Sequence, residues 1–219
     1  MKLTFPFLLS IALLTGCSSH TGKPEFTASG YLADQGSVRI WRKDSQPQLS
    51  HMLTIYTPFD GSVTETTDYH WQDGKLIAVE RHSSSGKAGD VTLRFDQTGK
   101  LNFMQRQLDG RKESLSEDDV ALYQFDARRM LQISDDLQHG KVRLKQGRWS
   151  ASGIVSSCQG DTLNPSFGRS AQNYLIQRRA GSSAVMGIAW LETAGDTQLL
   201  LVSNEDLCIN EPQEADFSA

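Results

Sequence analysis

The chain has 219 residues, of which 22% are charged and 38% hydrophobic, and its formal net charge is −4. This composition is typical of a folded globular protein and excludes a disordered chain. The length allows one large domain or two small ones. The mild acidity excludes the overall basic surface of a nucleic-acid-binding protein, so we expect no nucleic-acid partner.

The first residues have the features of a secretory signal peptide. Lys2 gives a positive start, and an apolar run from Phe5 to Leu14 follows it. This run of about ten residues is too short for a transmembrane helix, which needs roughly 20 apolar residues. We therefore predict that residues 1–16 are a signal peptide and that the rest of the chain does not span a membrane.

The tetrad Leu14-Thr15-Gly16-Cys17 resembles the lipobox of bacterial lipoproteins. In that family the cysteine thiol receives diacylglycerol, the signal peptide is cut before the cysteine, and the new amine is acylated. Ser18 stands where an aspartate would resemble the inner-membrane retention signal, so the resemblance implies the periplasmic face of the outer membrane. The alternative is an ordinary cleaved signal peptide that leaves Cys17 unmodified.

Two cysteines remain after Cys17, namely Cys158 and Cys208. In an oxidising compartment a single remaining pair is most simply a disulfide. It would close a loop of about 50 residues and stabilise the fold by about 4 kcal/mol in the chain-entropy model. Two free thiols or a redox site are the alternatives, although the chain has no Cys-x-x-Cys motif.

Residues 17–25 are short and polar, and we expect them to be a tether. From residue 26 to 115, β-branched and aromatic runs alternate with turn dipeptides such as Asp73-Gly74 and Asp109-Gly110, which predicts an antiparallel meander. Cross-strand pairing of apolar side chains then predicts four facing pairs. These are Trp71 with Leu76, Tyr69 with Ala78, Phe95 with Leu101, and Leu93 with Phe103.

One long helix is predicted over residues 116–138. Ser116 is a good N-cap, acidic residues follow it, apolar residues recur at helical spacing, and Gly140 is a reasonable end. Strands are predicted to return in 140–209, at 174–176, 185–191 and 199–202, with the last two central in the sheet because they are apolar on both faces. We expect residues 210–219 to be a frayed acidic tail.

The predicted fold class is therefore α+β, a mainly antiparallel β meander with one long helix packed on the sheet. Residues 26–209 would form a single mainly-β domain. Two β halves, 26–115 and 140–209, joined by the helix are the alternative arrangement.

We find no catalytic, phosphate-binding or calcium-binding motif, and we expect no cofactor. We also predict no metal site. A metal needs three or four convergent ligands, and in the expected hairpin His70 and His82 lie on opposite faces.

A basic strip is the most informative pattern outside the N-terminus. Lys141, Arg143 and Lys145 alternate with aliphatic residues, which places the three cations on one face of a strand, and Arg148 lies just beyond. Such a strip suits anionic partners such as phospholipid head groups, lipopolysaccharide or peptidoglycan carboxylates. The alternative is a solvated strand face with acidic neighbours.

With its lipobox and cysteine pair, the chain resembles a gammaproteobacterial family of lipoproteins of unknown function, a resemblance that implies no active site. Our leading hypothesis is a non-catalytic envelope lipoprotein that is anchored in the membrane by lipid and binds an envelope protein, peptidoglycan or lipid. A carrier of lipid or another hydrophobic ligand is the second hypothesis, and a large cavity beneath the helix would favour it. A cryptic envelope hydrolase is the third.

Overall fold

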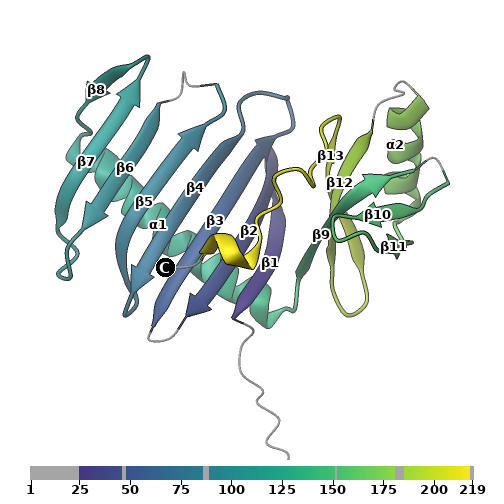
Figure 1. Cartoon of the computed structure of the whole chain (residues 1–219), viewed down its shortest axis with the longest axis horizontal. Coiled ribbons are helices and arrows are strands. Elements are labelled where there is room, and N and C mark those ends of the chain that lie inside the picture. The colour runs from purple at the N-terminus through teal and green to yellow at the C-terminus, as the bar shows by residue number, and fades with distance from the viewer. Residues whose placement is uncertain (1–24, 46–47, 86–88, 151, 181–184, 218–219) are drawn as a thin grey trace, which may run out of the picture.

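The computed structural model describes residues 25–45, 48–85, 89–150, 152–180 and 185–217. The predicted signal peptide, the lipobox with Cys17, and residues 18–24 of the predicted tether lie outside this part of the chain. The described residues form two antiparallel sheets and two α-helices, which is the α+β class expected from the sequence (Figure 1).

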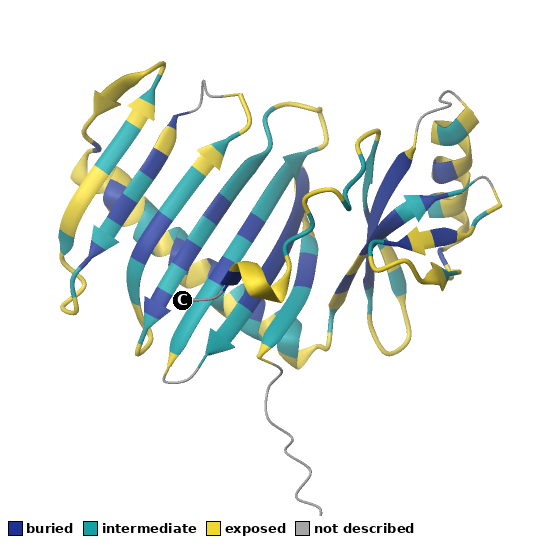
Figure 2. Cartoon of the chain, viewed as in Figure 1, coloured by how far each residue is buried: buried dark blue, intermediate teal, exposed yellow. Residues whose placement is uncertain are grey.

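The first sheet is an eight-stranded meander in which every strand pairs with its neighbours along the chain. Its strands are β1 (Phe26–Ala33), β2 (Gly36–Ser45), β3 (Leu49–Pro58), β4 (Glu65–Gln72), β5 (Lys75–Ser83), β6 (Asp90–Phe95), β7 (Leu101–Leu108) and β8 (Arg111–Glu113). Buried and less buried residues alternate along the middle strands, as in β4 and β6, because one face of each is packed against a core (Figure 2).

The predicted register is confirmed next to the turns and is wrong farther away. Trp71 pairs with Leu76 and Phe95 with Leu101, but each hairpin then shifts by one residue at a β-bulge. Beyond the bulges Tyr69 faces Val79, and Leu93 faces Met104. The cause is that a bulge places two residues of one strand opposite one residue of the other.

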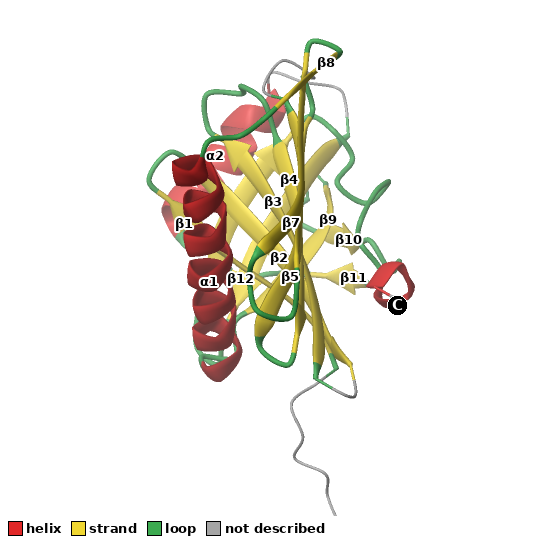
Figure 3. Cartoon of the chain, turned by 90° about the vertical axis from the view of Figure 1, so that its left-hand side faces the viewer, coloured by secondary structure: helices red, strands yellow, loops and turns green. Residues whose placement is uncertain are grey.

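Helix α1 (Glu117–His139) lies along one face of this sheet (Figure 3). Ser116 and Asp119 form a reciprocal capping box at its start, and Gly140 is its C-cap, as the sequence predicts. The space beneath the helix is occupied by packed side chains. They include Val38, Ile40, Met52, Tyr69, Trp71, Val79, Val91, Leu93 and Phe95 of the sheet, and Val120, Ala127 and Met130 of the helix.

The second sheet has five strands in the order β11-β10-β9-β12-β13. Its elements are β9 (Arg143–Trp149), β10 (Val155–Ser157), β11 (Thr162–Leu163), β12 (Met186–Glu192) and β13 (Thr197–Ser203), with α2 (Arg169–Ala180) between β11 and β12. Strand β12 is central and buried on both faces, as predicted. One face packs on α2 through Trp190 and Leu175, and the other packs toward the first sheet through Ala189 and Leu191.

Two sequence predictions are wrong in this half. Residues 174–176 are helical instead of extended, and within this apolar triplet only Leu175 is buried. Strand β13 is at the sheet edge instead of central. It is apolar because Leu200 packs close to Gly30 of β1, so the first sheet covers one of its faces.

The two sheets meet at β1 and β2. A cluster that includes Trp41, Leu144, Ala189, Leu191 and Leu200 joins them. Beside it, the buried Arg39 donates from Nη1 to Oε1 of Gln146 (2.7 Å), and Nε2 of Gln146 donates to Oε1 of Glu211 (3.0 Å). Burial lowers the pKa of the Arg39 guanidinium to about 10, and the charge of Glu211 acts in the opposite direction.

The C-terminal segment is held in two places. A disulfide joins Cys158, just after β10, to Cys208, with the two Cα atoms 5.0 Å apart. A short 3-10 helix, η1 (Glu214–Phe217), then lies on the face of the first sheet opposite α1 (Figure 3). The prediction of a frayed tail is therefore wrong as far as Phe217, which is 4% exposed and contacts the rings of Phe26 and His51.

Candidate functional site

The predicted basic strip lies at the start of the second sheet. Along β9 the exposed Arg143 and Lys145 alternate with the buried Leu144 and Gln146, as the period of a strand requires. Lys141 precedes the strand and is also exposed. Among the described residues, Lys141, Arg143 and Lys145 have no ion-pair partner.

Arg148 does not belong with the other three cations. Its Nε lies 2.8 Å from a carboxylate oxygen of Asp206, a residue that is close to the disulfide in the sequence. This ion pair neutralises the guanidinium and leaves it a structural role at the C-terminal segment. The structure thus divides the predicted strip into three unpaired cations and one paired arginine.

The three unpaired cations border a hollow of about 530 Å³ at the junction of the two sheets. Its walls come from the start of β1, the end of α1, and the first residues of β9. Phe26, Ala28, Val142 and Leu144 supply apolar lining, and His139 adds a further basic side chain. The site therefore combines an apolar lining with an unpaired cationic border.

Gln138 gives this hollow a polar group with unused hydrogen-bonding capacity. Its side-chain nitrogen donates to Oγ1 of Thr27 (3.2 Å), which fixes the amide between α1 and β1. Its Oε1 is buried and has no hydrogen-bond partner among the described residues. A buried acceptor without a partner is costly, so a donor group at this point would be stabilising.

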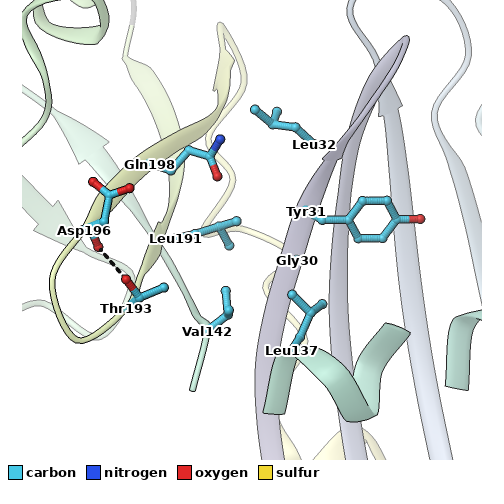
Figure 4. Close-up of a pocket in the computed structure, with 9 residues that line it drawn as sticks. All are labelled: Gly30, Tyr31, Leu32, Leu137, Val142, Leu191, Thr193, Asp196 and Gln198. Atoms are coloured by element: carbon cyan, nitrogen blue, oxygen red, sulfur yellow. Dashed lines mark hydrogen bonds between the residues drawn. The ribbon is translucent and has the colours of Figure 1, made fainter. Parts of the chain in front are cut away.

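A second hollow of about 310 Å³ lies beside the first, and the two share Val142 (Figure 4). Leu32, Leu137 and Leu191 contribute apolar lining, while Tyr31 points away and donates to the sulfur of Met130 (3.7 Å). No lysine or arginine of the described ranges lines it, and Asp196 contributes a carboxylate. It is therefore a poor site for an anion.

A third feature, the His51/Asp68/His70 cluster, was missed in the sequence. His51 of β3 faces His70 of β4 directly, and Asp68 is two residues from His70, so all three lie on one face of the first sheet. Asp68 bonds to Nε2 of His51 (2.8 Å), and the two imidazole rings stack at 4.0 Å. Burial, and then the proximity of His51, lower the pKa of His70.

The signal that could have found this cluster was the β3–β4 register, because it brings His51 next to the Asp68-x-His70 pattern. The sequence prediction rested on the β4–β5 hairpin, in which His70 and His82 lie on opposite faces. In the structure the exposed His82 instead approaches Asp90, with 3.5 Å between Nδ1 and the nearest carboxylate oxygen.

Comparison with known proteins shows the family. Residues 28–213, which include both sheets except for the first two residues of β1, match DUF1481, a protein family of unknown function. The chain belongs to the DUF1481 family. It is also 42% identical over 211 residues to the uncharacterized protein YjaH of Escherichia coli (strain K12), covering 96% of this chain and 91% of that protein. No solved structure matches the chain.

The family match assigns no ligand or reaction to the site, so what the site can bind is inferred from its geometry. The cations could be found in the sequence because strand periodicity places them on one face. The apolar lining could not, because Phe26 and Ala28 belong to β1, far from β9 in the sequence. Among the described residues, no helix is both long and apolar enough to cross a bilayer.

Proposed function

We propose that this protein is a non-catalytic, lipid-anchored binding protein at the periplasmic face of the outer membrane. Its ligand is an anionic phospholipid that occupies the 530 Å³ hollow. The observation that carries the proposal is the combination of three unpaired cations with an apolar lining in one site. A phospholipid has the same combination, since it carries a phosphate next to acyl chains.

Electrostatics supports an anionic ligand. A basic side chain close to an anionic lipid surface contributes about 1 kcal/mol, so Lys141, Arg143 and Lys145 together would contribute about 3 kcal/mol. The paired Arg148 adds little to this total, because its charge is already used by Asp206.

The other residues that line the hollow are suited to bind the remaining parts of a phospholipid. The hollow of about 530 Å³ is within the range of ligand-binding sites and suits a head group with the first part of an acyl chain. Gln138 also lines the hollow, so a small rotation of its amide would let the unsatisfied, buried Oε1 accept a hydrogen bond from a hydroxyl or ammonium group of the head group.

The proposed anchor would place the hollow close to the bilayer. Eight residues separate Cys17 from Phe26, and the nine Cα-to-Cα steps of an extended chain between them span at most about 30 Å. Because Phe26 lines the hollow, a lipid at Cys17 would keep the site within that distance of the membrane surface.

Carriage of a hydrophobic ligand beneath α1 is less well supported. The side chains between α1 and the sheet form one packed cluster in which Met52, Val79 and Leu93 are fully buried. We therefore place the proposed ligand in the hollow at the end of the helix.

The test is photo-crosslinking in intact cells. A photoreactive residue at Ala28, inside the hollow, should yield an adduct that mass spectrometry identifies as a phospholipid. The same residue at Phe103, which is 47% exposed on β7 and remote from the hollow, should not. A protein adduct at position 28, or no adduct there, would overturn the lipid proposal.

Charge-matched variants show whether the cations bind the lipid. The combined changes Lys141→Ala, Arg143→Ala and Lys145→Ala remove about 3 kcal/mol and should weaken affinity for short-chain phosphatidylglycerol about 100-fold. Replacing the exposed Lys100, Arg111 and Lys112 by alanine removes equal charge at the other end of the first sheet. Equal losses in both variants would indicate a nonspecific charge effect.

The proposed lipid anchor is tested by a separate variant. Cys17→Ser should release the protein from the membrane.

A further inference from the structure

We propose that His51, Asp68 and His70 form a binding site for one Zn²⁺ ion, on the face of the first sheet that carries the C-terminal segment. Each of the three residues offers a ligand atom, and these atoms lie within 4.8 Å of one another. This proposal is independent of lipid binding, because the cluster and the basic hollow share no residue.

The pairing of β3 with β4 brings the three side chains together. His51 and His70 are a directly facing pair on β3 and β4, and Asp68 faces Leu53, one step along the same face. Neighbouring strands keep these positions fixed without any loop. Two imidazoles and one carboxylate are a typical ligand set for Zn²⁺ that leaves a fourth position open.

The distances require only small side-chain movements. In a tetrahedral Zn²⁺ site with bonds of about 2.1 Å, ligand atoms are about 3.4 Å apart. Atoms at the 4.8 Å limit must therefore approach by about 1.4 Å, whereas Nε2 of His51 and the Asp68 carboxylate oxygen, now 2.8 Å apart, must separate slightly. The rings of His51 and His70 stack with an angle of 25° between their planes. Rotation about the broad χ2 torsion of histidine turns their nitrogens toward a common point.

The surroundings favour a cation. The pocket of about 480 Å³ that borders His51 and Asp68 also includes the carboxylates of Glu211 and Asp216. The nearby basic groups are already paired, Arg94 with Glu80 and Lys43 with Glu214. A bound ion would therefore meet net negative charge.

The ion would also hold the C-terminal segment on the sheet. The ring of Phe217 lies 4.6 Å from that of His51, so fixing His51 fixes the surface on which η1 packs. Zn²⁺ binding should consequently protect residues 209–217 from proteolysis and from hydrogen exchange.

The experiment uses the untagged full chain in detergent with Cys17→Ser, which removes the only cysteine outside the disulfide. Zn²⁺ competition against a chromophoric chelator should give one ion per chain, and Co²⁺ should give a tetrahedral visible spectrum. His70→Ala should weaken Zn²⁺ affinity at least tenfold and abolish that spectrum. Absence of one-to-one binding would overturn the proposal.

His82→Ala is the matched control, because His82 also lies close to an aspartate but has no third ligand in the part of the chain that the structure describes. It should leave affinity within about twofold, and an equal loss in His82→Ala and His70→Ala would overturn the proposal. If His70→Ala fails to fold, Asp68→Asn decides. It keeps a hydrogen-bond acceptor for His51 but removes the charge, so unchanged Zn²⁺ affinity in this variant would also overturn the proposal.

Discussion

The two sheets reach stability by different means. In the first sheet every pair of strands is consecutive in the chain, and a single capped helix covers one face. In the second sheet, β9 and β12 are partners although β10, β11 and α2 separate them in the sequence. A disulfide also joins Cys158, just after β10, to Cys208. Local connections thus suffice for a large meander, whereas the smaller sheet depends on links between distant residues.

Removal of the disulfide should show the difference in stability between the two sheets most clearly. With Cys158→Ser and Cys208→Ser, we expect a loss of about 4 kcal/mol in the free energy of unfolding, because the closed loop spans 50 residues. Hydrogen exchange should accelerate in β9–β13 while β3–β7 keep their protection. Equal acceleration in both sheets would mean that they unfold as one unit.

The junction between the sheets should give the next largest effect. Gln146→Ala leaves Nη1 of the buried Arg39 without its acceptor and removes the hydrogen bond from Gln146 to Oε1 of Glu211, so we expect a loss of about 2 kcal/mol, measured by urea unfolding. Both sheets should loosen together. Gln159→Ala is the control, since it removes only an exposed hydrogen bond to Glu211 (2.8 Å), and a comparable loss there would contradict the role of burial.

The cap of α1 tests the local stability of the first region. Ser116→Ala should cost about 1 kcal/mol in thermal unfolding, because the N–H of Asp119 loses its acceptor. Hydrogen bonds from the side chain and backbone of Ser116 lower the pKa of Asp119. The contribution of that carboxylate is therefore complete above the unfolded pKa of about 3.9 and is lost as pH falls through the lowered value. An unchanged melting temperature would contradict the capping role.

The start of α2 should give the smallest effect, in the opposite direction. Gly168 accepts the first helical hydrogen bond from Gln172 (3.1 Å), and a Cβ at this position would meet no atom within 4 Å. Gly168→Asp should therefore add a capping group and raise the free energy of unfolding by a few tenths of a kcal/mol. At Gly153 the backbone φ is +82°, so Gly153→Asp should destabilise the protein instead. A gain in the free energy of unfolding for Gly153→Asp would contradict this argument from backbone conformation.

The same contrast explains how much of the fold could be predicted. The meander and α1 follow from local signals, namely turn dipeptides, an N-cap and a C-terminal glycine. The predicted register is wrong beyond the first pairs of each hairpin. The bulges at His70/Trp71 and Arg94/Phe95 contain no residue type that indicates a bulge in the sequence. Helix α2 was missed since Tyr174 and Ile176 are exposed, so their apolar character reflects neither a buried strand nor an amphipathic stripe.

The candidate sites show the same limit. The cations of β9 were found from strand periodicity within one segment. The apolar lining next to them and the His51/Asp68/His70 cluster both depend on which strands become neighbours. Phe217 is a further case, because an acidic terminal segment gives no indication that its one aromatic side chain is buried.

The strictly consecutive pairing of the first sheet has a consequence for the order of folding. All of its strands and the helix that covers it lie within residues 26–139, so they can assemble hairpin by hairpin as the chain lengthens. Oxidation of Cys158 must wait for the arrival of Cys208. The N-terminal part can therefore form a nearly finished template first, and the segment that carries Cys208 then closes onto it.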